Sequence, residues 1–343
     1  MVVWNSKPDK KLVSFGLIKN LKGSNSINVV SLFHGCGGLD LGFKRQGYNI
    51  IWAIDFNKAA CETYRNNIGE HDICEDIKNV DSSIIPDCDI IIGGSPCQGF
   101  SNSNRHTHYL DNPKNFLVKE YIRIVKDKQP LIFVLENVPQ LLSCGNGQFI
   151  DEIKFQLKDY DINYKVLCAA DYNVPQLRRR TIVIGSKIGK IKYPSSYTTQ
   201  YKTVANAFKG LNCAIPNQLD YTHSKQGTIE RMKYIPQGGN FRSLPIEFQD
   251  SRMHSDIFRR LDYSKPSVTI ANPRKQLLLH PTENRIVSVR ECARIQSFPD
   301  DFIFYGNLSD KQQQVADAVP PLLSEAIAKQ IKEYIIQNKF WVA

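Results

Sequence analysis

Apolar segments alternate with helical patterns along the first half of the chain. Six short apolar runs are typical of buried strands, at residues 28–33, 49–55, 89–93, 130–136, 165–169 and 181–185. Between them, residues 57–67 and 116–126 repeat apolar side chains at helical spacing. Such alternation predicts an α/β fold with a doubly wound, mostly parallel sheet. Ligands of these sheets bind at the carboxyl ends of the strands.

The pattern changes after about residue 188, where Pro, Asn, Gln, Thr and basic residues become frequent. We therefore predict a catalytic and cofactor-binding domain over 27–187 and a smaller irregular domain with a hinge over 188–311. Helical spacing returns over 319–335, so we expect 312–343 to complete the first domain. Residues 1–26 are rich in lysine without a long apolar segment, which predicts a basic extension, neither a signal peptide nor a membrane span.

The composition points to an anionic partner. The 343 residues carry a formal net charge of +10, which favours nucleic acid, although an excess that only aids solubility would look the same. None of the nine cysteines forms a CxxC pair, so we expect free thiols, no disulfide framework and no metal site.

A glycine-rich turn, residues 33–40, follows the first apolar run. Its glycines allow the backbone to approach a ligand closely. A dinucleotide-binding turn would need glycine where Asp40 stands, which disfavours NAD. Asp55, which ends the second run, suits a ribose, and Phe56 suits the face of an adenine. With Asp76 and Ile77 near the same base, these residues predict an adenosine-containing cofactor.

Three further segments place reactive side chains at strand ends. Cys97 follows the run 89–93, which would place a reactive thiol at the end of a strand; an inert buried thiol is the alternative. Glu136 ends another buried run, and burial raises a carboxyl pKa toward values suited to proton sharing; a capping glutamate is the alternative. Strand alternation points Arg178 and Arg180 the same way, so that they can hold an oxygen atom, unless the run is simply solvated.

These segments together resemble the cytosine-5 DNA methyltransferases. The motifs follow that family's order: FxGxGG at 33–38, Pro-Cys-Gln at 96–98, Glu-Asn-Val at 136–138, QxRxR at 176–180, RECARIQSFP at 290–299 and VADAVPP at 315–321. The resemblance covers about residues 27 to 337. It is weakest between 188 and 285, where this family has its variable target-recognition region.

The resemblance implies S-adenosylmethionine as cofactor. Phe33, Gly35, Gly37 and Gly38 would surround its methionine part, with Asp55 on the ribose and Phe56, Asp76 and Ile77 on the adenine. The full set of expected cofactor residues is Phe33, Gly35, Cys36, Gly37, Gly38, Leu39, Asp55, Phe56, Asp76, Ile77, Pro96, Asp317, Ala318 and Val319.

The resemblance also implies a mechanism. The target cytosine would leave the duplex stack, and the Cys97 thiolate would add to its carbon 6. Glu136 would hydrogen-bond or protonate N3, Arg180 would hold O2, and Arg178 would support the site. Carbon 5 would then take the methyl group and lose its proton to a base that the sequence does not identify.

Double-stranded DNA is the implied substrate. The segment 99–113 corresponds to a loop that closes over DNA in this family. Basic residues of the recognition region are expected to contact DNA as well. Expected DNA contacts are Gln98, Ser101, Ser103, Arg105, Arg242, Arg259, Arg260, Arg274 and Lys275. Arg290, Glu291, Arg294 and Gln296, by contrast, are expected to be structural.

One departure concerns the last motif. The family usually has Gly-Asn where this chain has Ala316-Asp317, which places a negative charge near a cofactor that carries its own carboxylate. A tRNA cytosine methyltransferase of the same fold is an alternative, although the Cys-Phe-Thr element of that branch is absent. A catalytically silent DNA-binding relative is another. We expect a monomeric, cytoplasmic bacterial enzyme of a restriction-modification system, without a stable complex with the nuclease.

Overall fold

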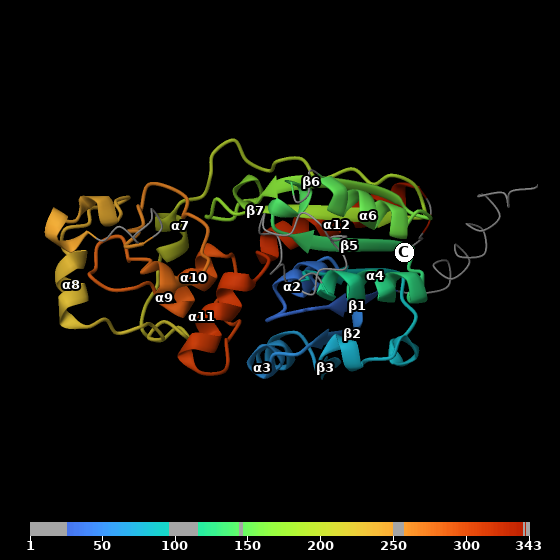
Figure 1. Cartoon of the computed structure of the whole chain (residues 1–343), viewed down its shortest axis with the longest axis horizontal. Coiled ribbons are helices and arrows are strands. Elements are labelled where there is room, and N and C mark those ends of the chain that lie inside the picture. The colour runs from blue at the N-terminus through green and yellow to red at the C-terminus, as the bar shows by residue number, and fades with distance from the viewer. Residues whose placement is uncertain (1–25, 96–115, 144–146, 250–256, 339, 341–343) are drawn as a thin grey trace, which may run out of the picture.

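Two lobes make up the molecule, and the sheet lies in the larger one (Figure 1). The structure is a computed structural model that describes residues 26–95, 116–143, 147–249, 257–338 and 340. Within these residues, no helix has both the length and the apolar character needed to cross a membrane.

A seven-stranded sheet in the order β3-β2-β1-β4-β5-β7-β6 organises the larger lobe. Its strands are β1 (Asn28–Leu32), β2 (Asn49–Asp55), β3 (Asp72–Cys74), β4 (Ile90–Gly93), β5 (Ile132–Asn137), β6 (Asp161–Cys168) and β7 (Arg179–Ser186). The pairs from β3 through β5 are parallel, whereas β7 runs antiparallel to both β5 and β6. The predicted doubly wound, mostly parallel sheet is confirmed.

Helices cover both faces of this sheet. Those of the larger lobe are α2 (Gly38–Arg45), α3 (Lys58–Asn67), α4 (Phe116–Lys128), α5 (Gln140–Ser143), α6 (Gln148–Gln156) and α12 (Pro321–Gln337), with short 3-10 turns at Ile77–Asn79, Ser82–Ile84 and Ala169–Tyr172. Val29 of β1 faces a core that contains side chains of α2, α3 and α12. Its neighbour Val30 faces a second core with α4 and α6. Burial on both faces explains why the central strands are continuously apolar.

The edges of the sheet differ from the sequence prediction. β6 begins at Asp161 rather than at residue 165, and the three-residue β3 was not expected. Both are edge strands. The first residues of β6 are half-buried or exposed, so polar side chains there hide the strand from a pattern that seeks apolar runs.

The C-terminal helix α12 packs against α2 near the start of the chain. Tyr48 donates a hydrogen bond to the Ala328 carbonyl at 3.0 Å, and Ser324 donates one to the Leu39 carbonyl. A Cβ atom added at Gly42 would lie 2.4 Å from the Ser324 side chain, so the two helices meet without room for a larger residue. Residues 321–337 thus belong spatially to the larger lobe (Figure 1).

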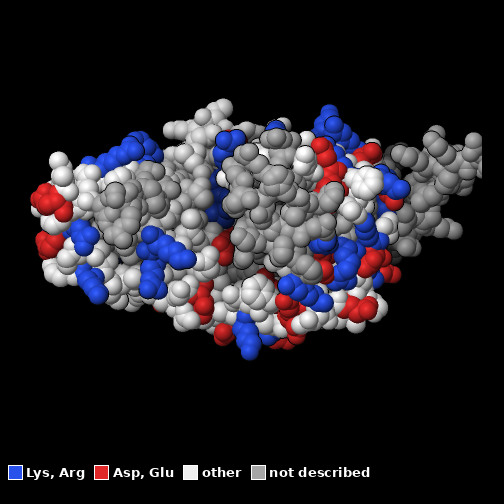
Figure 2. Space-filling view, viewed as in Figure 1, with Lys and Arg blue, Asp and Glu red and all other residues white. Residues whose placement is uncertain are grey.

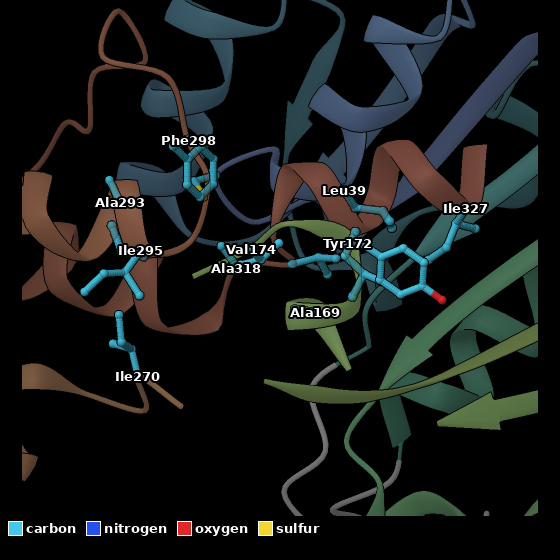
Figure 3. Packing of buried hydrophobic residues seen from close by; sticks show 14 of the residues in the cluster. Leu39, Ala169, Tyr172, Val174, Ile270, Ala293, Ile295, Phe298, Ala318 and Ile327 are labelled. Atoms are coloured by element: carbon cyan, nitrogen blue, oxygen red, sulfur yellow. The ribbon is translucent and has the colours of Figure 1, made fainter. Parts of the chain in front are cut away.

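The smaller lobe is built from short elements and loops. They are α7 (Val204–Phe208), α8 (Gln226–Met232), α9 (Pro273–Gln276), α10 (Val289–Ile295) and α11 (Leu308–Asp317), with 3-10 turns at Phe241–Ser243 and Ile246–Phe248. Its core continues into that of the sheet lobe: Leu39 and Ile327 belong to the same cluster as Ile270, Ala293 and Phe298 (Figure 3). The domain boundaries at 187/188 and at 311/312 both remain predictions.

Buried arginines hold the smaller lobe together. The Arg290 guanidinium is fully buried and donates to the carbonyls of Pro216, Pro299 and Phe302. Arg294 forms a two-pronged ion pair with Asp300. The Glu291 carboxylate accepts from Arg285 and from the Ser288 backbone, while Gln296 donates to the Val315 carbonyl. The structural role expected for Arg290, Glu291, Arg294 and Gln296 is therefore confirmed.

Candidate active site

The sheet register brings the predicted reactive segments to one edge. Leu32 pairs with Ile54 on one side and with Gly93 on the other, and Gly93 pairs with Leu135. The residues that follow these positions therefore leave the sheet side by side, at the carboxyl ends of the parallel strands. This is the edge where ligands of doubly wound folds bind.

The glycine-rich turn opens a space at this edge. Phe33, Gly35 and Gly37 have positive φ values of 56°, 56° and 92°, so the chain turns sharply between β1 and α2. A Cβ atom added at Gly35 would meet nothing within 4 Å, which leaves open space beside the backbone. Cys36, Leu39 and Gly38 are buried, and they can contribute to a ligand site chiefly through their backbone.

Asp55 ties the second strand to this turn. One carboxylate oxygen accepts the Gly35 N–H at 2.9 Å and the other accepts the Asn57 N–H at 2.8 Å. The next side chain, Phe56, is 63% exposed, which is unusual for a phenylalanine and leaves its ring available to a planar group. The open turn, the fixed carboxylate and the uncovered ring fit an adenosine that carries an extended tail.

The third segment at this edge begins with Asp76. Its carboxylate accepts the Lys78 N–H and caps the turn Ile77–Asn79. The Ile77 side chain is 3% exposed and belongs to the second core, which also contains Trp52. Ile77 can therefore offer an adenine only its backbone, whereas Asp76 is half-buried at the surface.

The end of α11 forms the opposite wall. The Cys36 thiol donates to the Gln314 carbonyl, with 3.7 Å between sulfur and oxygen. A Cβ atom added at Gly38 would lie 2.3 Å from the Val319 carbonyl oxygen and 3.4 Å from Ala318. Asp317, Ala318 and Val319 thus lie against the glycine-rich turn although some 280 residues separate them in the sequence.

Glu136 stands where β4 and β5 end together. A Cβ atom added at Gly94 would lie 2.9 Å from a Glu136 carboxylate oxygen, so the chain after β4 passes directly by this side chain. Asn137 donates to the Ser95 carbonyl at 3.1 Å and ties down the last described residue before the predicted nucleophile. Gly94 and Asn137 are not among the predicted site residues; their contacts follow from the register between β4 and β5.

Several predicted residues follow Ser95 directly but lie outside the described residues. They are Pro96, Cys97, Gln98, Ser101, Ser103 and Arg105.

Glu136 and Arg180 form a buried ion pair. The Arg180 Nε atom lies 2.9 Å from a Glu136 carboxylate oxygen, and both side chains are largely covered. Burial raises the pKa of Glu136 above its usual value, although the Arg180 and Arg178 guanidinium groups oppose that rise. The pair offers a carboxyl group able to hold a proton beside a cation able to hold an oxygen.

Arg178 has a different environment. It is 1% exposed, and its guanidinium donates to the Ile270 carbonyl at 3.1 Å and to the Ala316 carbonyl at 2.9 Å. It therefore joins the strand that carries Arg180 to the smaller lobe and to the end of α11. This geometry favours a positioning role for Arg178 over direct contact with a substrate.

Basic side chains occur on both lobes of the face shown in Figure 2. Among the predicted DNA contacts, Arg242, Arg274 and Lys275 are exposed and Arg259 is half-buried. The prediction for Arg260 is wrong. Its guanidinium is buried and donates to the carbonyls of Ile235, Met232, His280 and Glu283 and to the Asn284 side chain, so no donor remains for DNA.

A polar cluster beneath the glycine-rich turn was not anticipated. The His34 Nδ1 atom lies 2.7 Å from the Gly35 carbonyl oxygen, and its Nε2 atom lies 3.8 Å from Asp72. Tyr64 donates to the buried Asp40 carboxylate at 3.1 Å. Asp40, which in the sequence only argued against NAD, thus supports the turn from below.

Three side chains of this region resemble a metal-ligand set. Within the described residues, His34, Cys61 and Asp72 each place one donor atom within 4.8 Å of the others. However, Arg65 already pairs with Asp72 at 2.6 Å, and burial raises the pKa of the Cys61 thiol, which disfavours the thiolate that zinc requires. A hydrogen-bonded cluster fits these contacts better, and the absence of a metal remains a prediction.

Comparison with protein families gives one match over most of the chain. A family model described as C-5 cytosine-specific DNA methylase matches residues 27–333. The chain is 37% identical to the Type II methyltransferase M1.HphI of Haemophilus parahaemolyticus, covering 93% of this chain and 90% of that protein. It is 36% identical to the Type II methyltransferase M.NgoFVII of Neisseria gonorrhoeae, covering 94% and 91%.

Solved structures show the same architecture. One described as a prophage-encoded DNA modification methyltransferase from E. coli superposes with a TM-score of 0.74 at 25% identity, covering 91% of this chain and all of that one. The S. pombe Dnmt2 methyltransferase superposes with a TM-score of 0.66, covering 91% and 99%, but at 13% identity it supports the fold alone.

Proposed function

The chain belongs to the C-5 cytosine-specific DNA methylase family and is a DNA cytosine-5-methyltransferase, and we propose that it acts on a cytosine flipped out of a specific duplex sequence. The observation that carries this proposal is the Glu136–Arg180 pair at the edge where β4 ends. It combines, in one buried place, a proton donor for N3 and a cation for O2 of the same base.

The residues at the sheet edge fit S-adenosylmethionine. When bound, this cofactor supplies an electrophilic methyl group. We propose that Asp55 accepts hydrogen bonds from the ribose hydroxyls and that Phe56 covers one face of the adenine. The glycine-rich turn and Asp317–Val319 would enclose the methionine part from two sides.

Cys97 is the nucleophile in this proposal. Its thiolate adds to carbon 6 of the cytosine, forming a carbon–sulfur bond, while Glu136 shares its proton with N3. Arg180 holds O2 as electron density moves into the ring. Carbon 5 thereby becomes nucleophilic and takes the methyl group as the sulfur–methyl bond of the cofactor breaks, which would leave S-adenosylhomocysteine. Loss of the carbon 5 proton to a base and return of the N3 proton to Glu136 then expel the Cys97 thiolate and restore the aromatic ring.

The proposal also covers the biological system, the compartment and the oligomeric state of the enzyme. The two relatives above are both named Type II methyltransferases. We propose that this chain is likewise the modification enzyme of a restriction-modification system, and that it works in the cytoplasm as a monomer on double-stranded DNA. The proposed chemistry uses a thiol, a carboxyl group and a guanidinium, and we propose no metal.

Trapping on 5-fluorocytosine tests the reaction. Fluorine at carbon 5 cannot leave as a proton does, so the enzyme should remain bound to duplex DNA through Cys97 after methyl transfer. We expect an adduct that survives denaturing electrophoresis and requires S-adenosylmethionine.

A folded Cys97→Ala variant is the control and should form no adduct. An equal adduct with that variant would disprove the nucleophile. Bisulfite sequencing of DNA from cells that express the protein would then identify the methylated site.

A further inference from the structure

We propose that Asp317 binds the α-ammonium group of the cofactor, and that Gln313 and Asn272 position its carboxylate for this contact. The inference rests on the proposed function, because it presumes that S-adenosylmethionine binds at this edge. It concerns two residues, Gln313 and Asn272, for which the sequence predicted no role.

The backbone places Asp317 beside the methionine part of the site. Arg178 donates to the Ala316 carbonyl at 2.9 Å and lies 3.4 Å from that of Asp317. The neighbouring segment is pressed against the glycine-rich turn, because a Cβ atom at Gly38 would lie within 2.3 Å of Val319. The backbone of Asp317 is thus fixed at the wall that faces this turn, while its side chain is exposed.

A chain of hydrogen bonds orients the carboxylate. The Gln313 side-chain amide donates to both Asp317 carboxylate oxygens, at 2.8 and 2.9 Å. The side-chain oxygen of Gln313, Oε1, in turn accepts from the Asn272 side-chain amide at 2.8 Å. Asn272 caps α9 of the smaller lobe by accepting the Lys275 N–H at 3.0 Å. The cofactor side of the site is therefore connected to the helix that carries Arg274 and Lys275.

Within the described residues, no basic side chain forms an ion pair with the exposed Asp317 carboxylate. The guanidinium groups of Arg178 and Arg180 act on it electrostatically, but the first donates to backbone carbonyls and the second pairs with Glu136. Asp55, Glu136 and the Cys36 thiol are the other titratable groups that face it. Within the described residues, hydrogen bonds to this carboxylate come from Gln313 alone, which is neutral.

The ammonium group of the cofactor can serve as the cationic partner of the Asp317 carboxylate. Of the ionic groups in the methionine part, the carboxylate would be repelled by Asp317, while the ammonium can donate a charge-assisted hydrogen bond. An asparagine at this position would offer an oxygen without charge. Asp317 therefore makes the site select a ligand that carries an amino group.

The inference can be tested without turnover by comparing the binding of two ligands, one with the charged amino-acid end and one without it. S-adenosylhomocysteine keeps the ammonium group, whereas 5′-methylthioadenosine lacks the amino-acid end. By calorimetry, Asp317→Asn should weaken S-adenosylhomocysteine binding about tenfold or more, the scale of one charge-assisted hydrogen bond. Its affinity for 5′-methylthioadenosine should stay within about twofold, since that ligand makes no such contact.

Two further variants separate positioning from folding. Gln313→Met keeps the size of the side chain but removes the amide, and it should reproduce part of the loss for S-adenosylhomocysteine. Asp159→Asn removes an exposed carboxylate near the start of β6, beside the amino ends of the parallel strands and thus away from the cofactor site. This variant should bind both ligands as the unaltered protein does.

The pH dependence gives an independent readout. S-adenosylhomocysteine affinity should fall as Asp317 becomes protonated at low pH, and this dependence should disappear in Asp317→Asn. Unchanged affinity in Asp317→Asn, or an equal loss for both ligands, would overturn the inference. Failure of the unaltered protein to bind either ligand would instead contradict the proposed cofactor.

Discussion

Glu136 shows how one side chain obtains its chemistry from its neighbours. Burial raises its pKa, the Arg180 guanidinium lies against it, and Gly94 leaves room for its carboxyl group. A glutamate with a raised pKa keeps its proton at a pH where an exposed one has lost it. This is the property that protonation of a cytosine N3 requires.

Glu136→Gln should slow methyl transfer by about 10²- to 10⁴-fold, the range for loss of a general acid. Glutamine can still donate a hydrogen bond but cannot transfer a proton. In the unaltered enzyme the single-turnover rate should fall as pH rises through the pKa of Glu136, because the protonated form is lost. The variant should lack this alkaline decline.

Cofactor affinity provides the control for this variant. S-adenosylhomocysteine binding by Glu136→Gln should match that of the unaltered protein. A variant that transfers methyl groups at the normal rate would remove Glu136 from the mechanism.

At the scale of elements, the contact between α2 and α12 joins the glycine-rich turn to the end of the chain. Gly42 lies in α2 where a Cβ atom would meet the Ser324 side chain at 2.4 Å, and it is fully enclosed. Gly227, in the first turn of α8, is also helical, but a Cβ atom there would meet nothing within 4 Å. The two glycines therefore contrast a crowded helical position with an open one.

Alanine at these positions should have opposite effects on the free energy of unfolding. Gly42→Ala should lower it by about 1–3 kcal/mol through overpacking against α12. Gly227→Ala should raise it by up to about 1 kcal/mol, because alanine favours the helix and nothing obstructs it. Urea denaturation monitored by circular dichroism measures both. Equal effects in the two variants would mean that the α2–α12 contact is looser than described.

The elements that sequence analysis predicted are those with strong local signals. The central strands are apolar throughout because both faces of the sheet are covered, and α3 and α4 follow helical spacing closely. β3 has three residues and β6 begins with polar ones, so neither gives such a signal. The antiparallel direction of β7 depends on pairing across the sheet, which local patterns do not encode.

The candidate site divides in the same way. Asp55, Glu136 and Arg180 stand at strand ends or starts, and their side-chain chemistry is visible in the sequence. The pairing of Gln313 in α11 with Asn272 at the cap of α9 joins residues 41 positions apart, and neither periodicity nor motif predicts this contact. The prediction that Arg260 contacts DNA is wrong because the sequence does not show the backbone carbonyls that bind its guanidinium. Without them, a basic residue in a loop-rich segment is expected to be exposed.

At the scale of the molecule, the two lobes share a core and are tied by specific side chains. Arg178, just before β7 of the sheet lobe, donates to the Ile270 and Ala316 carbonyls of the smaller lobe. A shared core of this kind resists independent movement of its parts. The arrangement suits an enzyme that must hold a duplex and a cofactor in fixed relation.

DNA affinity should report on the exposed basic residues of the smaller lobe. If Arg274 and Lys275 contact phosphates, alanine at either should weaken binding and reduce the slope of log affinity against log salt by about 0.9. Fluorescence anisotropy at several salt concentrations measures this slope.

Arg260→Ala provides the contrast. It should lower the free energy of unfolding by about 2–4 kcal/mol, because five acceptors, three of them in buried hydrogen bonds, lose their donor, and it should leave the salt slope unchanged once folded. A reduced slope in this variant would mean that Arg260 does contact DNA phosphates.

The packing of α12 on α2 also sets an order of assembly during synthesis. The glycine-rich turn leaves the ribosome early, but its second wall, from Gln314 to Val319, is made some 280 residues later. Until then the Gly42 face of α2 has no partner and the methionine part of the pocket has one side only. A growing chain thus acquires its complete cofactor site only after α11 has been made, so a polypeptide released before α11 would lack that wall.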